Sequence, residues 1–117
     1  MNLISFNLRG LGGGPKRAAL KRLIELVSPA IIFLQETMSV GDRACDFFLQ
    51  LKPGWKVYAM DAAGHFGGTL AAWNPMLINL CAFNTVAGIL LQGKLLGFNL
   101  PVHLLNVYGP YENRQNL

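Results

Sequence analysis

Three polar residues that could take part in chemistry follow strand-like stretches of this sequence. Glu36 ends IIFLQE, where four apolar residues typical of a buried strand precede a glutamine and a carboxylate. Asn7 ends LISFN, and Tyr108 ends VHLLNVY. Burying a carboxylate costs free energy unless a partner compensates its charge. Glu36 is therefore either a solvated loop residue or a metal ligand at the mouth of a site, and the residues alone leave both open.

The elements that would position these residues are predicted by hydrophobic periodicity. Residues 2–7 and 30–35 are expected strands. The segment between them begins with a glycine-rich loop and continues as a helix that starts at Pro15 and ends before Ser28 and Pro29. Its buried stripe has i, i+3, i+4, i+7 spacing and consists of Leu20, Leu23, Ile24 and Val27. These two strands and the helix between them are predicted to form a βαβ unit with a parallel strand pair and a right-handed crossover.

A second helix and five further strands are expected after Glu36. The helical stripe consists of Ala44, Phe47, Phe48 and Leu51, and Pro53-Gly54 ends the helix. Strands are predicted over residues 55–60, 67–73, 76–83, 88–95 and 102–108. Strands joined this closely pair antiparallel. The predicted class is α/β, a βαβ unit followed by a mostly antiparallel strand meander in a mixed sheet, within one domain.

The predicted sheet would gather the polar residues at one edge. In open α/β sheets, functional groups collect beyond the carboxyl ends of the strands. We therefore expect Asn7 and Glu36 to lie at neighbouring strand ends, with Tyr108 facing the same cleft.

Composition and charge limit the class of protein. Apolar residues make up 52% of the chain and charged residues 14%, yet no apolar run is long enough for a membrane helix. The first ten residues lack the basic start and the long apolar core of a signal peptide. We expect an intracellular protein, in the nucleus or cytoplasm, with two reduced cysteines. The net charge of +4 suits a polyanionic partner such as nucleic acid.

Four stretches resemble, in order and spacing, the endonuclease/exonuclease/phosphatase superfamily: ISFNLRGL, IIFLQET, GHFGGTLAAWNP and LLNVYGPY. The sequence is most similar to the endonuclease domain of non-LTR (LINE-type) retrotransposons. The resemblance covers nearly the whole chain and implies that residues 1–117 are a partial domain, the N-terminal half of a four-layer α/β sandwich. It also implies hydrolysis of nucleic-acid phosphodiesters, with DNA as the expected substrate and Mg²⁺ as the usual cofactor.

The resemblance assigns roles to the polar strand ends. It makes Glu36 the metal-binding carboxylate, Asn7 the amide that positions metal and phosphate, and Tyr108 the hydroxyl that reaches the scissile phosphate. The family's Asp-x-Asn cluster and Ser-Asp-His motif are absent from this sequence, and His65 and His103 precede the position of the catalytic histidine. We therefore expect weak Mg²⁺ binding and leave activity open.

Other interpretations remain beside these roles. Asn7 could be a turn residue that bonds its own backbone, and Tyr108 a core tyrosine. Arg9, Lys16 and Arg17 are expected nucleic-acid contacts, although a basic helix face is often merely solvated. The chain as a whole could be a non-catalytic remnant of a mobile element or a basic nucleic-acid-binding module. Exposed apolar strand faces would favour self-association.

Overall fold

The computed structural model describes residues 1–62, 67–97 and 99–107. Its elements are β1 (Leu3–Asn7), α1 (Gly14–Val27), β2 (Ile31–Gln35), α2 (Gly41–Leu51), β3 (Lys56–Met60), β4 (Thr69–Trp73), β5 (Ile78–Asn84), β6 (Gly88–Leu95) and β7 (Pro101–Val107). These elements have the predicted types and order, and the strand bounds differ from the predicted ones by at most two residues. The predicted end of the last strand, residue 108, lies outside the described residues.

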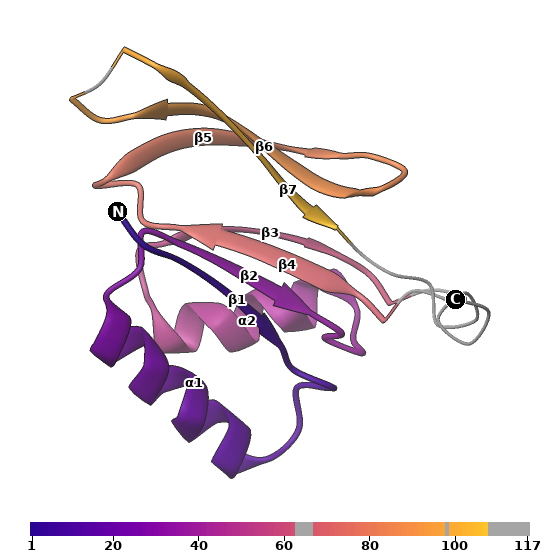
Figure 1. The fold of residues 1–117 in the computed structure, drawn as a ribbon. Coiled ribbons are helices and arrows are strands. Elements are labelled where there is room, and N and C mark those ends of the chain that lie inside the picture. The colour runs from indigo at the N-terminus through magenta and orange to yellow at the C-terminus, as the bar shows by residue number, and fades with distance from the viewer. Residues whose placement is uncertain (63–66, 98, 108–117) are drawn as a thin grey trace, which may run out of the picture.

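The elements form three layers, with the two helices on one face of the first sheet and the second sheet on its other face (Figure 1). The first sheet has the strand order β1-β2-β4-β3, and the second has the order β5-β6-β7. β1 and β2 are parallel, as expected for a βαβ unit. The pairs β2–β4, β3–β4, β5–β6 and β6–β7 are antiparallel. The predicted α/β class is confirmed.

The strands expected after Pro53-Gly54 are divided between two sheets and do not share one mixed sheet. Residues 74–77 carry the chain from β4 to β5 through a tight turn. The Asn74 carbonyl accepts hydrogen bonds from the Leu77 and Ile78 N–H groups (3.0 and 3.2 Å), and its side chain accepts one from Met76 N–H (3.0 Å). Because this turn redirects the chain, β5 leaves the first sheet instead of pairing with β4.

Two apolar layers hold the three structural layers together. On the helix side, side chains of both helices pack on the first sheet; the buried members of this layer include Leu20, Ile24, Phe48, Ile32, Leu34 and Leu70. Between the sheets, the buried members include Ile31, Phe33, Trp73, Ile78, Ile89 and Leu91. β2 contributes alternate residues to both layers, so the prediction of a buried strand is confirmed and both of its faces are covered. Each fully buried aliphatic side chain contributes on the order of 1.5–3 kcal/mol to stability.

The helices end where the sequence indicated. Pro15 lies in the first turn of α1, and Ser28 ends this helix in a left-handed conformation (φ 51°) with its N–H bonded to the Ile24 carbonyl (2.8 Å). Within the described ranges, neither helix is long and apolar enough to cross a membrane.

The outer face of the second sheet carries exposed apolar side chains. Phe83, Leu90 and Leu105 are cross-strand neighbours on β5, β6 and β7. Phe83 and Leu105 are 47% and 41% exposed, and Val107 is 58% exposed. This outer face is therefore an apolar surface that water covers in the isolated chain.

Candidate functional site

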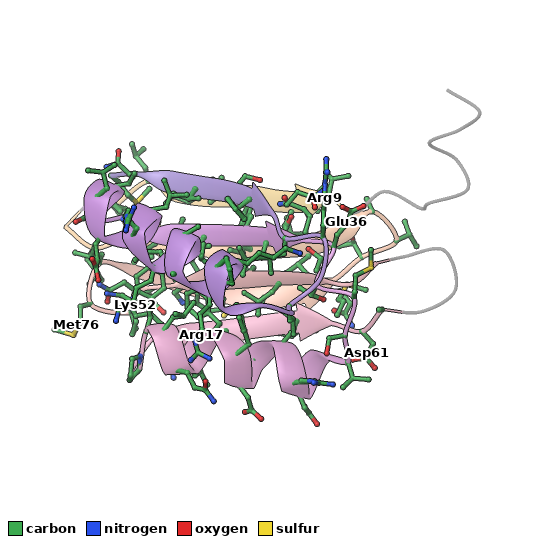
Figure 2. All side chains as sticks on the ribbon, turned by 90° about the horizontal axis from the view of Figure 1, so that it is seen from below. Arg9, Arg17, Glu36, Lys52, Asp61 and Met76 are labelled. Carbon is green, nitrogen blue, oxygen red and sulfur yellow. The ribbon has the colours of Figure 1, made fainter. Side chains whose placement is uncertain are left out.

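The carboxyl ends of β1 and β2 meet at one edge of the first sheet. Asn7 lies opposite Gln35, and the Leu8 N–H donates to the Gln35 carbonyl (2.9 Å). One step further, the Gly10 N–H donates to the Glu36 carbonyl (2.7 Å). Asn7 and Glu36 therefore lie at neighbouring strand ends, and Figure 2 shows Arg9 and Glu36 at the same end of the molecule.

Glu36 is buried, with 7% of its surface exposed. The interpretation of Glu36 as a solvated loop residue is therefore wrong. Hydrogen bonds from the next two residues hold the backbone in place: Thr37 N–H donates to the Gly68 carbonyl (3.3 Å) and Met38 N–H to the Gly67 carbonyl (2.5 Å). Burying a carboxylate costs free energy, which hydrogen bonds, a protein cation or a metal ion can offset.

Backbone strain is concentrated around Glu36. Arg9, Glu36 and Met38 adopt left-handed conformations with φ of 52°, 53° and 55°. Each such residue costs roughly 1–2 kcal/mol relative to an ordinary conformation, and strained residues cluster at functional sites. The described part of the chain contains one other non-glycine residue with positive φ, Ser28 at the end of α1.

Asn7 stabilises a turn through its side-chain oxygen, which accepts a hydrogen bond from the Arg9 N–H (3.1 Å). The interpretation of Asn7 as a turn residue is thus confirmed. The residue is exposed, and its amide nitrogen makes no hydrogen bond within the described ranges. Asn7 can therefore act as a turn residue and still offer a donor to a ligand.

Of the predicted basic residues on α1, Lys16 lies at the Glu36 end of the sheet, whereas Arg17 contacts α2. The Lys16 ammonium donates to the carbonyls of Arg9 and Gly10 (2.8 and 3.4 Å), so it holds the glycine loop at the Glu36 end. The Arg17 guanidinium instead bonds the Gln50 side chain and lies 5.8 Å from the centre of the Phe47 ring. Arg17 therefore joins α1 to α2, away from Glu36 (Figure 2).

A depression beside Glu36 includes a basic residue that sequence reasoning missed. It is lined by residues 10–12, residues 37–39 and Arg43 of α2. Arg43 is exposed, so its guanidinium can meet an anion there. Its place on the first turn of α2 gave no signal in the sequence, because the stripe that identifies this helix is apolar.

Two of the predicted residues lie outside the described ranges. Tyr108 directly follows the last residue of β7, and His65 belongs to the segment 63–66. His103 lies on β7, where its side chain is exposed and its Nδ1 lies 3.3 Å from Gln92 Nε2.

A buried polar cluster next to Glu36 was also missed. Asn106 is 1% exposed and Thr69 is fully buried, and both bond with neighbouring strands. In the structure Asn106 shares the inward-facing parity of Val102 and Leu104, whereas residues 103, 105 and 107 are exposed. Because both parities of this strand carry apolar residues, the sequence did not indicate which face turns inward.

Glu36 is the predicted metal ligand among the described residues. Mg²⁺ prefers oxygen ligands and keeps several waters, so it needs only one or two protein carboxylates. The described ranges contain no cluster of three or more His, Cys, Asp or Glu side chains that could hold a metal ion. Weak Mg²⁺ binding by Glu36 therefore stays a prediction.

Two facing sheets with helices packed on the outside of one define an α/β fold. The structure is similar to the crystal structure of AP endonuclease LMAP from Leishmania major, with a TM-score of 0.68 and 19% sequence identity. The match covers 97% of this chain and 43% of that enzyme, so the chain spans less than half of the enzyme's length. No family model and no curated protein matches the sequence. The chain thus has an AP-endonuclease-like α/β fold.

Proposed function

We propose that this chain is part of a metal-dependent nucleic-acid phosphodiesterase domain of the endonuclease/exonuclease/phosphatase superfamily, of the retrotransposon type, and that it corresponds to the N-terminal half. The observation that carries the proposal is the burial of Glu36 in a strained backbone at the joined ends of β1 and β2. The AP-endonuclease-like fold and the four sequence stretches support it.

The proposed roles follow from the chemistry of each group. Glu36 would hold Mg²⁺, which stabilises charge on the phosphate oxygens when it is bound. The Asn7 amide nitrogen would donate a hydrogen bond to the same phosphate, and the Tyr108 hydroxyl would reach it from the end of β7.

The proposed substrate is DNA. Arg9 and Lys16 lie at the Glu36 end, and Arg43 lines the adjoining depression, so three cations surround the place where a phosphate backbone would approach. Arg17 is engaged with α2 and contributes less to this surface. Binding through such cations weakens as salt concentration rises.

Metal binding can be tested by following amide resonances during a Mg²⁺ titration. We expect weak binding that shifts the Gly10 resonance and is lost in Glu36→Gln. Glu25→Gln is the matched control, because Glu25 is an exposed carboxylate on α1. Binding that survives Glu36→Gln, or that disappears equally in Glu25→Gln, would contradict the assignment.

Activity and nucleic-acid binding need separate measurements. We expect no nicking of supercoiled plasmid above background, because the sequence contains neither the Asp-x-Asn nor the Ser-Asp-His motif. Nicking that vanishes in Glu36→Ala would show that this chain is already complete as a catalyst.

Fluorescence anisotropy with labelled DNA tests binding. Arg9→Ser should weaken DNA binding more than Lys21→Ser, which changes an exposed cation of α1. Equal effects would favour a diffuse basic module, and no binding a non-catalytic remnant.

We further propose that the isolated chain self-associates through the apolar outer face of the second sheet, since large exposed apolar patches promote association. Leu105→Lys should shift sedimentation toward monomer. Val86→Lys, at a 97% exposed position between β5 and β6, should not. A wild-type monomer at high concentration would refute this proposal.

A further inference from the structure

Asn106 links the second sheet to the first through a buried set of hydrogen bonds. Its amide nitrogen donates to Thr69 Oγ1 and to the Leu70 carbonyl, both at 2.9 Å. Its amide oxygen accepts from Gln35 Nε2 at 3.0 Å. Asn106 belongs to β7, whereas all three partners belong to β2 or β4 of the first sheet. One side chain of the second sheet therefore makes three hydrogen bonds to the first sheet.

The bonds extend from Asn106 to the residues directly before Glu36. Gln35 Nε2 also donates to Ser5 Oγ on β1 (2.9 Å), and the Thr69 hydroxyl donates to the Leu34 carbonyl (2.9 Å). Of the last two residues of β2, Gln35 is thus held by its side chain and Leu34 by its main-chain carbonyl. Glu36 is the next residue along the chain, so its position depends on this support.

The arrangement requires the chemistry of a primary amide. Asn106 uses two N–H donors and one acceptor at a site that is 1% exposed. A carboxylate of the same shape has no donor, and a leucine has neither donor nor acceptor. Most other contacts between the sheets are apolar and non-directional. The Tyr58 hydroxyl on β3 also donates to the Asn84 side chain on β5 (2.7 Å), but the hydrogen bonds of Asn106 are the ones that reach the end of β2.

We propose that Asn106 is a positioning residue for Glu36. It holds the end of β7 on the end of β2 and thereby sets where the Glu36 backbone and carboxylate lie. The consequence for metal binding rests on the function proposed above, whereas the effect on the position of Glu36 does not.

The reporter for this proposal is the Gly10 amide, which donates to the Glu36 carbonyl and is remote from Asn106 in the sequence. In ¹H–¹⁵N spectra at neutral pH, Asn106→Asp should shift the Gly10 resonance while resonances of the outward-facing residues of α1 keep their wild-type positions. Ser5→Ala is the control: it removes the outermost hydrogen bond of the set and leaves the three bonds of Asn106 intact. We expect a smaller Gly10 shift in this control.

Acid provides a rescue that general destabilisation would not show. Once protonated, the carboxyl group introduced by Asn106→Asp regains a donor, so the Gly10 resonance should return toward that of the wild type measured at the same acidic pH. Should Asn106→Asp fail to fold, Thr69→Val carries the test, because it removes one partner of Asn106 at nearly constant volume. It should displace the Gly10 resonance at every pH, without rescue by acid.

Paramagnetic broadening by Mn²⁺ tests the metal site separately from the positioning of Glu36. In the wild type, Mn²⁺ should broaden Gly10, and Glu36→Gln should abolish the effect. Asn106→Asp should reduce it several-fold at neutral pH. Absence of broadening in the wild type would refute the metal site alone, since the Gly10 shift still reports position. A wild-type Gly10 resonance in both Asn106→Asp and Thr69→Val would overturn the positioning role.

Discussion

Gly68 offers a direct test of how tightly the backbone around Glu36 is packed. A methyl group placed on Gly68 would lie 2.3 Å from Thr37 Oγ1, 3.2 Å from the Ala62 nitrogen and 3.4 Å from the Met60 oxygen. Its φ of +85° also disfavours any residue with a side chain. Gly68→Ala should therefore strain both its own backbone and the residue that follows Glu36.

The expected loss of stability combines three contributions. The left-handed backbone costs about 1 kcal/mol, and forcing a methyl group into filled space costs about 1–3 kcal/mol. Reduced freedom of the unfolded chain returns about 0.4–1 kcal/mol. The net expectation for Gly68→Ala is a loss of about 1–3.5 kcal/mol, whose middle value corresponds to roughly 10 °C in Tm for a chain of this length.

Urea denaturation followed by circular dichroism measures this loss, and Gly54→Ala is the matched control. Gly54 has nearly the same φ, +88°, but a methyl group there would meet nothing within 4 Å. Gly54→Ala should therefore lose only the backbone contribution, less than about 1 kcal/mol.

A double-mutant cycle identifies the contact responsible. The Thr37 hydroxyl is buried without a hydrogen-bond partner in the described part of the chain. Thr37→Ala removes that oxygen, so it should recover about 1–2 kcal/mol in the Gly68→Ala background. Equal losses in Gly68→Ala and Gly54→Ala, or no coupling with Thr37→Ala, would refute the packing argument.

Two further predictions concern other parts of the molecule. Gly93→Ala should destabilise the chain strongly and disrupt β5–β6 pairing, because its methyl group would lie 1.9 Å from the Asn79 carbonyl oxygen; persistent hydrogen-exchange protection of β5 amides would contradict this. Burial, and secondarily two aspartates of α2, raise the pKa of the Cys45 thiol, so at pH 8 Cys45 carries less of the reactive thiolate and iodoacetamide should alkylate it more slowly than the exposed Cys81. Raising the pH should increase the Cys45 rate, and mass spectrometry of the two cysteine peptides measures the ratio.

The fold was largely predictable because the elements carry strong local patterns. The stripe of α1 and the apolar run of β2 specify type and approximate bounds without tertiary information. The division into two sheets was not predictable, because Asn74-Pro75 is equally typical of a hairpin turn. What decides the outcome is the set of hydrogen bonds that Asn74 makes, including donation of its N–H to the Ala30 carbonyl (2.9 Å). Such contacts between distant segments leave no local trace.

The sequence predicted which residues lie at the strand ends of the candidate site. It did not predict the burial of Glu36 or the hydrogen bonds of Asn106 that hold the end of β2. Glu36 and Asn7 were found because parallel strands bring their carboxyl ends together. The burial of Glu36 depends on segments far away in sequence, among them Gly67 and Gly68. The role of Asn106 escaped notice because apolar residues occupy both parities of β7, so the sequence did not show which face turns inward.

The bridge between the sheets has a consequence for the order of folding. The Asn106–Gln35 hydrogen bond joins residues 71 positions apart, whereas β5, β6 and β7 pair with their neighbours in the chain. Closing a long loop costs more entropy than closing a hairpin. We expect the sheets to dock after the hairpins have formed, so Asn106→Ala should accelerate unfolding more than it slows folding in stopped-flow experiments. Slower folding with an unchanged unfolding rate would contradict this order. If docking is late, Glu36 acquires its final surroundings only after most of the core exists, and a partly folded chain offers no assembled site to a metal ion or to nucleic acid.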